Sequence, residues 1–306
     1  KIDYLGAVLL TTALSSVVLF TSLGGRTYAW DSPFILSLIA LAALAVPAFL
    51  MVERRAVEPI LPLALFSHST FILFSGIGAI VGASMFGAAT FLPLYLQVAK
   101  GISPTDSGLQ MLPMMLGVMA GSIGSGRIMA KTGHYRRLPF FGMIVLVTGL
   151  STLTQLQPDT PRWMLIGMMA LVGLGMGPTM SVGTTAIQNA VPREMLGVAT
   201  SGFTLFRQVG GSIGIALFGA LFSSQLGAKL AGHLPPGAEP GAFGAAQVAA
   251  LPPAARTAVA TAFTEAMHPI FAIAAALAAV AFVLTLFIVE KPLEHRVGHG
   301  GPGGGH

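Results

Sequence analysis

The stretch FLPLYLQVAKGISPTDSGLQMLPMMLGVMAGSIGSGRIMAKTGHYRR, residues 91–137, contains the features that decide the fold. An apolar run ends at Gln97, a short polar turn follows, a second apolar run begins at 107, and basic residues close the stretch from Arg127 onward. A helix that crosses roughly 30 Å of hydrocarbon needs about 20 mostly apolar residues. Apolar runs of this length, separated by short polar turns, predict helices that span a membrane.

The whole chain follows the same pattern. In hydrocarbon the backbone groups must be hydrogen-bonded internally, and these runs are too long for the strands of a barrel. We therefore predict an all-α, polytopic membrane protein with eight transmembrane helices. The runs lie at 5–23, 34–52, 71–97, 107–127, 139–156, 163–187, 197–224 and 266–289.

The composition supports this class. Of the 306 residues, 54% are hydrophobic and only 9% are charged, against about 25% charged in an ordinary soluble domain. The absence of cysteine excludes disulfides, thiolate metal sites and cysteine nucleophiles. In a membrane protein the net charge of +5 reflects basic residues in the loops, whose positions indicate the topology, rather than a surface for nucleic acid. We expect no cofactor, because no nucleotide-binding glycine loop or paired metal-binding histidines occur in the sequence.

The basic residues outside the apolar runs predict the orientation. Cytoplasmic loops are enriched in Lys and Arg, so the side with ten of them, and both ends of this segment, should face the cytoplasm. The ten are Lys1, Arg54, Arg55, Arg127, Lys131, Arg136, Arg137, Arg193, Lys291 and Arg296. The five on the other side are Arg26, Lys100, Arg162, Lys229 and Arg256.

Two segments lie outside the predicted helices. The segment 225–265 is rich in Ala, Gly and Pro and is expected to form an external loop with a short helix near 254–265. The Gly-rich tail 295–306 carries His295, His299 and His306. It is predicted to be disordered, and weak metal binding is the alternative.

Two stretches resemble the major facilitator superfamily, in particular its fourteen-helix drug:proton antiporter branch of the EmrB/QacA type. One is 91–137, with Gln97, a Gly-x-x-Pro turn and a basic loop; the other is GLGMGPTMSVGTTAIQNAVPREMLGVATSGFTLFRQVGGSIGIALFG, residues 173–219. The resemblance implies two linker helices in 1–69 and the C-terminal six-helix bundle in 70–294. Because the first residue is Lys1, we expect an N-terminal six-helix half elsewhere in a longer chain.

The same resemblance implies roles for two parts of the bundle. The basic segment 126–137 is similar to the cytoplasmic gating motif of the superfamily, with Ala130 where that motif carries Asp. The matching residues are Gly126, Arg127, Lys131, Gly133, Arg136 and Arg137. Helices 71–97 and 163–187 would each open a unit of three helices, the two units would be inverted relative to each other, and these two helices would line the transport cavity.

Arg207 lies about ten residues into the run 197–224, where a cation costs at least about 2.5–3.5 kcal/mol unless it meets water or a partner. It is therefore predicted to face a cavity, beside Thr204 and Gln208 at helical spacing. The alternative is a structural arginine that bonds carbonyls of neighbouring helices or reaches the cytoplasm. Further cavity candidates, for which interhelical packing or hydrogen bonding is the alternative, are Gln188, Asn189, Thr184, Tyr95, Gln97 and Met180.

All eleven acidic residues lie in predicted loops or at predicted helix ends. A proton carrier needs a titratable group in the cavity, so the proton-coupling residues are expected in the N-terminal half. The nearest candidates in this chain are Glu265 and His268, which are spaced to share a helix face. The alternative for this pair is a solvated helix start.

These observations together predict part of a secondary active transporter, one that exports lipophilic or cationic drugs from a bacterial inner membrane in exchange for protons by alternating access. Its expected partners are the bilayer, protons, the substrates and the N-terminal half. The alternatives are an exporter of a siderophore, lipid or metabolite, a membrane scaffold, and a membrane-embedded enzyme. The last alternative rests on Gly210-Gly-Ser212-Ile-Gly214, which matches the spacing of a hydrolase nucleophile elbow.

Overall fold

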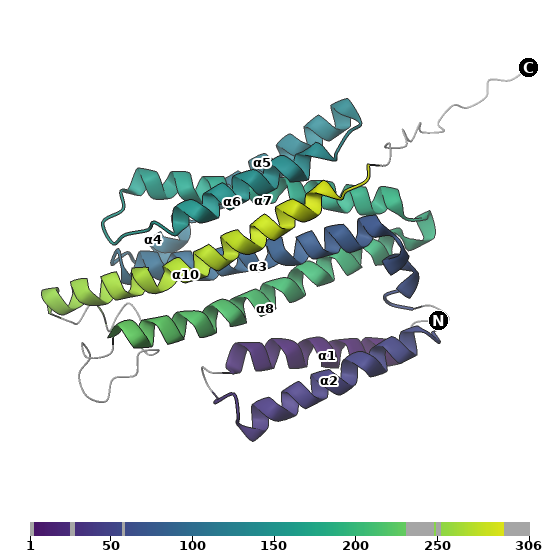
Figure 1. Cartoon of the computed structure of the whole chain (residues 1–306), viewed down its shortest axis with the longest axis horizontal. Helices are drawn as coiled ribbons and strands as arrows, with labels where there is room; N and C mark the ends of the chain where they lie inside the picture. The colour runs from purple at the N-terminus through teal and green to yellow at the C-terminus, as the bar shows by residue number, and fades with distance from the viewer. Residues whose placement is uncertain (1–2, 25–27, 57–58, 231–247, 249–251, 291–306) are drawn as a thin grey trace, which may run out of the picture.

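The computed structural model describes residues 3–24, 28–56, 59–230, 248 and 252–290. Regular structure in these ranges is helical, apart from one isolated bridge between Gly24 and Tyr28 (Figure 1). The long helices are α1 (Tyr4–Leu23), α2 (Pro33–Glu53), α3 (Ser69–Val98), α5 (Leu112–Thr132), α6 (Arg137–Leu153), α7 (Arg162–Ala190), α8 (Leu196–Leu230) and α10 (Pro253–Leu286). The short ones are η1 (Leu63–Ser67), α4 (Pro104–Leu109) and η2 (Arg193–Met195). The prediction of an all-α protein is confirmed.

Each of the eight predicted runs corresponds to one long helix. Within the described ranges, six helices are long and apolar enough to cross a membrane, namely α1, α2, α3, α7, α8 and α10. Helix α6 is apolar but has only 17 residues. Helix α5 has 21 residues, and its glycines, serines and basic residues make it less apolar. Helix α5 packs on α7, and α6 packs on α7 and α10, so both belong to the bundle (Figure 1).

Successive long helices run in alternate directions along the long axis of the molecule (Figure 1). Helix α1 begins and α10 ends at the same end of the bundle, on the right in Figure 1. This end also carries the turns between α5 and α6 and between α7 and α8. In these turns or in the adjoining helix ends lie Arg127, Lys131, Arg136, Arg137 and Arg193. This end of the bundle is called the basic end below, and the opposite end is called the far end.

Several helix boundaries differ from the predicted ones. Helix α5 starts at Leu112 rather than 107, because Ser103 caps the separate short helix α4. It ends only at Gly133, whose positive φ of 69° closes the helix in the left-handed conformation. Helix α8 continues to Leu230, and α10 begins at Pro253 and continues unbroken through Pro269. The predicted loop 225–265 is therefore partly helical, and 231–247, 249–251 and the tail 295–306 lie outside the described residues.

Close backbone contacts join two pairs of helices. In the pair α5–α7, a Cβ on Gly117 would lie 2.5 Å from the carbonyl oxygen of Ala170, and one on Gly121 would lie 2.5 Å from that of Leu174. In the pair α3–α8, a Cβ on Gly82 would collide with the carbonyl oxygen of Arg207. Apolar faces gain little by leaving lipid for another apolar face, so small residues that allow close approach are what hold such helices together.

Some of the helix contacts keep their form when α3, α5 and α6 are exchanged with α7, α8 and α10, although the contacts of α8 with α10 and with α7 have no counterpart of similar extent. Under this exchange the pair α3–α8 becomes α7–α5, and the pair α6–α7 becomes α10–α3. Helices α3 and α7 contact each other, as do α6 and α10. This pattern agrees with the predicted division of the bundle into two units of three helices.

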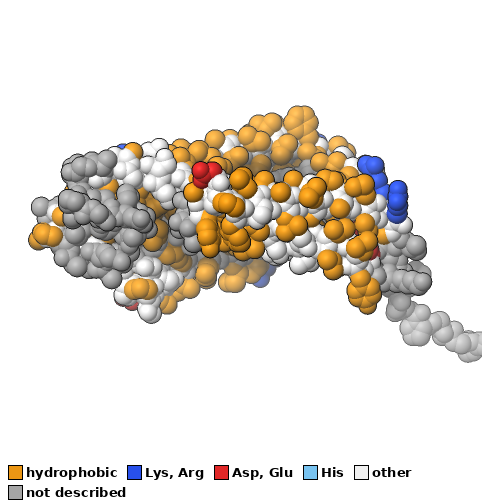
Figure 2. All heavy atoms as spheres, turned by 90° about the horizontal axis from the view of Figure 1, so that it is seen from below, with side chains coloured by type: hydrophobic (Ala, Val, Ile, Leu, Met, Phe, Trp, Pro, Cys, Tyr) orange, Lys and Arg blue, Asp and Glu red, His pale blue; other side chains and the backbone are white. Residues whose placement is uncertain are grey.

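Helices α1 and α2 form a hairpin beside the bundle, and α1 packs against α8 (Figure 1). The segment that follows the hairpin also touches α8, because the rings of Phe66 and Phe206 are 6.1 Å apart and Leu61 lies against Gly202. The outer face of α2 is apolar and exposed, for example at Leu44 (72%). Figure 2 shows hydrophobic side chains along the middle of this side of the molecule, with basic side chains at one end, as expected for a surface that faces lipid.

The α5–α7 contact generates a stability prediction. A Cβ on Gly173 would collide with the carbonyl oxygen of Met114, whereas nothing lies within 4 Å of one on Gly167 of the same helix. We expect Gly173→Ala to destabilise the protein by about 1–3 kcal/mol, the usual cost of overpacking. Gly167→Ala is the matched control and should leave stability nearly unchanged. Thermal unfolding in detergent measures both, and equal midpoints for the two variants would contradict the packing described here.

Candidate functional site

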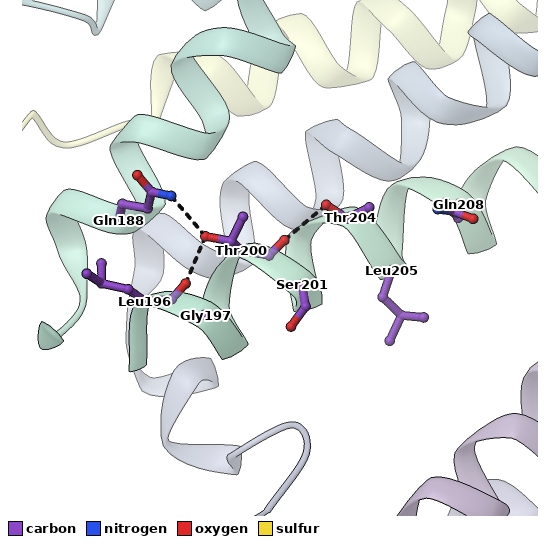
Figure 3. Close-up of a pocket in the computed structure, with 8 residues that line it drawn as sticks. All are labelled: Gln188, Leu196, Gly197, Thr200, Ser201, Thr204, Leu205 and Gln208. Carbon is purple, nitrogen blue, oxygen red and sulfur yellow. Dashed lines mark hydrogen bonds between the residues drawn. The ribbon is translucent and has the colours of Figure 1, made fainter. Parts of the chain in front are cut away.

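An open hollow of about 720 Å³ lies between the last turn of α7 and the first turns of α8, near the basic end (Figure 3). This volume is within the usual range for small-molecule sites, about 300–1,000 Å³. Its lining residues are Gln188, Leu196, Gly197, Thr200, Ser201, Thr204, Leu205 and Gln208. This set of residues is called the α7–α8 hollow below. It contains three of the cavity residues predicted from sequence, Gln188, Thr204 and Gln208.

Hydrogen bonds fix the polar wall of the α7–α8 hollow. The side-chain amide of Gln188 donates to the hydroxyl of Thr200 over 3.1 Å and so joins the two helices (Figure 3). The hydroxyls of Thr200 and Thr204 donate to carbonyl oxygens one turn earlier in α8, Thr200 to Leu196 at 2.8 Å and Thr204 to Thr200 at 3.0 Å. A hydroxyl that donates in this way keeps lone pairs for a further donor.

The lining carries no formal charge and combines these polar groups with Leu196 and Leu205. Such a wall suits a compound that is mainly apolar and offers a few hydrogen-bond donors or acceptors. Gln188 and Gln208 are exposed, so their side-chain amides are accessible from the open side. The residues that line the α7–α8 hollow include no acidic, basic or histidine side chain.

Arg207 is adjacent in sequence to this hollow but does not line it. Its backbone carbonyl and its Cγ lie against Gly82 of α3. The side chain is half-buried, and among the described residues it has no hydrogen bond or ion pair. Among the described residues Arg207 therefore does not bond carbonyls of neighbouring helices, which was one form of the structural alternative.

The remaining cavity candidates fall into two groups. On α7, Thr184 and Met180 are half-buried, and the hydroxyl of Thr184 donates to the carbonyl of Met180 at 3.1 Å. Asn189 is half-buried and neighbours Gln188. Tyr95 and Gln97, in contrast, lie at the far end of α3, away from the α7–α8 hollow.

Tyr95 and Gln97 both make connections within the fold. Tyr95 is fully buried, and its hydroxyl donates to the carbonyl of Gln157 at 2.6 Å. The amide of Gln97 donates to the hydroxyl of Ser107 at 2.9 Å and ties α3 to α4. Tyr95 thus ties α3 to the connection between α6 and α7, and Gln97 has the interhelical role that was the alternative to a cavity lining.

The predicted gating segment is mostly helical. Gly126, Arg127 and Lys131 belong to α5, Gly133 is its C-cap, and Arg136 and Arg137 lead into α6. The four basic side chains are exposed at the basic end. They therefore form a charged surface there rather than a buried network.

Glu290 is a residue of this region that the sequence did not single out. Its carboxylate, just beyond the end of α10, accepts hydrogen bonds from the backbone amides of Tyr135 at 2.6 Å and Arg136 at 3.3 Å. The guanidinium of Arg136 donates to the carbonyl of Leu286 at 3.4 Å. Glu290, far away in the sequence, thus stabilises the turn between α5 and α6. The gating segment itself has Ala130 where the superfamily motif carries Asp. No spacing rule in the sequence connects positions this far apart.

Glu265 and His268 lie in α10, and both line a hollow at the far end with Lys229. Glu265 forms a 2.6 Å ion pair with Lys229 of α8, and a ring nitrogen of His268 is 2.7 Å from the carbonyl oxygen of Leu156. Glu265 is inside a continuous helix, so the expectation that it marks a helix start is wrong. The two residues connect α10 to α8 and to the end of α6.

The nucleophile-elbow pattern at 210–214 also has a structural explanation. These residues lie within α8, without the strand and sharp turn that the motif requires. A Cβ on Gly210 would collide with the backbone of Ala79, and one on Gly214 would lie 2.6 Å from the Cβ of Ala83. The glycines therefore serve the contact of α8 with α3.

Comparisons with known proteins agree with this architecture. The family model described as Major Facilitator Superfamily matches residues 3–215. A multidrug transporter protein, MdtP, of Bacillus subtilis is 40% identical over 218 residues, which are 71% of this chain and 40% of that protein. A tetracycline resistance determinant of Streptomyces rimosus is 37% identical over 216 residues, 70% of this chain and 62% of that protein. The chain therefore spans less than two thirds of these relatives.

A solved structure with the same fold is the bacterial homologue of the human lysosomal transporter Spinster, in an inward-facing and occupied conformation. Its TM-score is 0.61 at 16% identity, over 92% of this chain and 64% of that one. The family model, the Bacillus subtilis relative and the solved structure are all described as transporters and not as enzymes. The resemblance predicted from the stretches 91–137 and 173–219 is confirmed, and the chain, a multi-pass membrane protein, belongs to the Major Facilitator Superfamily.

Proposed function

We propose that this chain supplies two linker helices, in 1–69, and the C-terminal six-helix half, in 70–294, of an exporter that expels lipophilic drugs in exchange for protons. The observation that carries the proposal is the uncharged, partly polar α7–α8 hollow in a chain whose relatives are named for multidrug transport and tetracycline resistance. Its open side would be completed by an N-terminal six-helix half of the same protein.

Alternating access would follow from rocking of the two halves around the bound drug. The pairs α3–α8 and α5–α7 are held by backbone contacts at glycines, which favours movement of this half as one body. Helices α7 and α8 would then present Gln188 and Thr204 to the drug at the basic end and carry them as the half turns. The bilayer delivers lipophilic or cationic compounds to this site.

Proton coupling is assigned in this proposal to the N-terminal half. Of the described acidic residues, Glu265 alone lies well inside a long helix, and it is already paired with Lys229. Glu265 and His268 would contribute to coupling only if the ion pair opened during transport. A proton carrier in the cavity must titrate while it faces the substrate, and the described lining of the α7–α8 hollow has no such group.

The proposed location is a bacterial inner membrane, with the basic end in the cytoplasm. These 306 residues contain no cysteine, so single cysteines introduced here can report the topology in a full-length protein whose other cysteines, where present, are replaced. We expect Gln155→Cys, at the far end, to react with a membrane-impermeant maleimide in intact cells. Arg193→Cys, at the basic end, should react only after the cells are permeabilised. The reverse pattern would contradict the orientation.

The α7–α8 hollow itself can be tested in the full-length protein. Gln188→Leu removes an exposed side-chain amide of the hollow that can hydrogen-bond a drug. One such bond is worth about 0.5–1.5 kcal/mol, so we expect drug efflux to fall by roughly two- to tenfold. Thr148→Ala is the control, because Thr148 is exposed on α6 and bonds only its own helix. Efflux of a panel of lipophilic drugs from cells measures both, at matched expression.

The outcomes of that experiment separate the functions. Unchanged efflux in Gln188→Leu would contradict a substrate role for the α7–α8 hollow. No drug efflux from cells with the intact protein would indicate an exporter of a siderophore, lipid or metabolite, or a scaffold, and would overturn the proposal.

Arg207 provides an independent prediction. Its guanidinium has no partner among the described residues and is half-buried, so we propose that it meets the drug or the N-terminal half. Arg207→Ala should reduce drug resistance at normal expression, and Arg207→Lys, which keeps the charge without the planar fork, should restore part of it. Wild-type resistance in both variants would show that the side chain has no transport role.

A further inference from the structure

A second hollow, of about 820 Å³, lies at the far end, between the end of α3, the short helix α4 and the start of α7. It is separate from the α7–α8 hollow and from the one that contains Glu265. Its lining includes the charged residues Lys100, Asp106 and Arg162, together with apolar residues such as Leu109 and Leu112. It is called the α3–α4–α7 hollow below. Neither the predicted transport role nor the gating segment uses it.

The two cations lie where membrane-spanning helices end. Lys100 is two residues beyond the last residue of α3, and Arg162 is the first residue of α7. The neighbouring Trp163 is 75% exposed, and tryptophan is enriched at the level of lipid headgroups. The α3–α4–α7 hollow is therefore placed at the boundary between hydrocarbon and water.

The cations retain the capacity to bind phosphate. The ammonium of Lys100 uses one of its three donors on the carbonyl oxygen of Thr160, at 2.5 Å. Arg162 is exposed and has no hydrogen bond or ion pair in the part of the chain that the structure describes. A guanidinium matches the geometry of phosphate oxygens in a two-pronged contact.

Burial lowers the pKa of Lys100, and the neighbouring Asp159 opposes this shift. The attraction between a cation and a phosphate is stronger where the cation is partly desolvated than where it is surrounded by water.

The carboxylate of Asp106 makes the charge of this hollow mixed. It accepts a hydrogen bond from the hydroxyl of Ser103 at 2.8 Å and is exposed. Two cations and one carboxylate line the hollow, and Asp159 lies near Lys100 but outside the lining. Lining charges of both signs complement a headgroup that carries both a phosphate and an ammonium. A headgroup whose second substituent is anionic or neutral would offer no cation to the carboxylate.

The apolar part of the lining fits the remainder of a lipid. Leu109 is 59% exposed and Leu112 is 48% exposed, and both lie on the edge of the same hollow as the charged groups. Free phosphate compounds would leave these leucines in contact with water, whereas an acyl chain would cover them.

We propose that the α3–α4–α7 hollow binds a phospholipid with a phosphoethanolamine headgroup. Lys100 and Arg162 hold the phosphate, Asp106 receives the primary ammonium, and Leu109 and Leu112 contact the acyl chains. In the proposed orientation the lipid belongs to the outer leaflet. Its binding ties the ends of α3 and α7, the two helices that open the three-helix units.

Native mass spectrometry of the full-length protein, titrated with phosphatidylethanolamine, phosphatidylglycerol and phosphatidylcholine, tests this site. We expect one phosphatidylethanolamine to be retained preferentially. Arg162→Gln should weaken its retention at least about tenfold, because it removes a charge-assisted contact to the phosphate. Lys229→Gln is the matched control, since it removes a cation at the same end but outside this hollow.

A second variant addresses the carboxylate. Asp106→Asn keeps a hydrogen-bond acceptor for Ser103 and removes the charge, so it should abolish the preference for phosphatidylethanolamine over phosphatidylglycerol without loss of binding. Soluble phosphoethanolamine should not compete, because it lacks acyl chains. Equal retention of the three lipids by the intact protein, or equal retention of phosphatidylethanolamine by Arg162→Gln and Lys229→Gln, would overturn the proposal.

Discussion

The close approach of helix backbones at glycine is the interaction on which this structure depends. In a bilayer, helices gain little by exchanging lipid contacts for contacts with another apolar face. In the pairs α5–α7 and α3–α8, glycines such as Gly117 and Gly82 stand where any larger side chain would collide with the backbone of the partner helix. The two backbones can therefore come into direct contact. Each pair joins the first helix of one three-helix unit to the second helix of the other. The two units thereby interlock into one bundle.

This arrangement explains where polar groups are left available. The face of α8 that carries Gly210 and Gly214 is taken up by α3, so Thr204 and Gln208 are turned toward a different side, where they form the α7–α8 hollow with Gln188. Arg207 lies between the two faces, with its backbone in the helix contact and its guanidinium unpaired among the described residues. One side of α8 thus packs against α3, and another side contributes to the candidate binding site.

The sequence predicted much of the fold because the bilayer imposes a simple length rule. All eight apolar runs are helices, and the alternation of basic loops agrees with the two ends of the bundle. Predicted helix ends were less accurate where a local conformation sets the end. Helix α5 continues past Arg127 and ends at Gly133, which is in the left-handed conformation. Helix α10 was predicted too short, because a polar residue such as Glu265 was treated as a helix end although α8 provides its partner, Lys229.

The candidate site was predictable only in part. Helical spacing grouped Thr204 with Gln208, and their hollow confirms that they share a side of α8 with access from outside. Spacing within one helix carries no information about partners on another helix, so it did not reveal that Tyr95 bonds Gln157 or that Glu290 holds the turn at Tyr135. For the same reason the mixed charges around Arg162 became apparent only when α3, α4 and α7 were brought together.

The central claim, that this chain is half of a proton-driven drug exporter, is tested most directly by transport in proteoliposomes. The full-length protein would be reconstituted, a pH gradient imposed, and accumulation of a fluorescent lipophilic cation followed. The account predicts accumulation that depends on the gradient and stops when a protonophore dissipates it. Movement of the compound at the same rate with and without the gradient, or at the rate of protein-free vesicles, would contradict it.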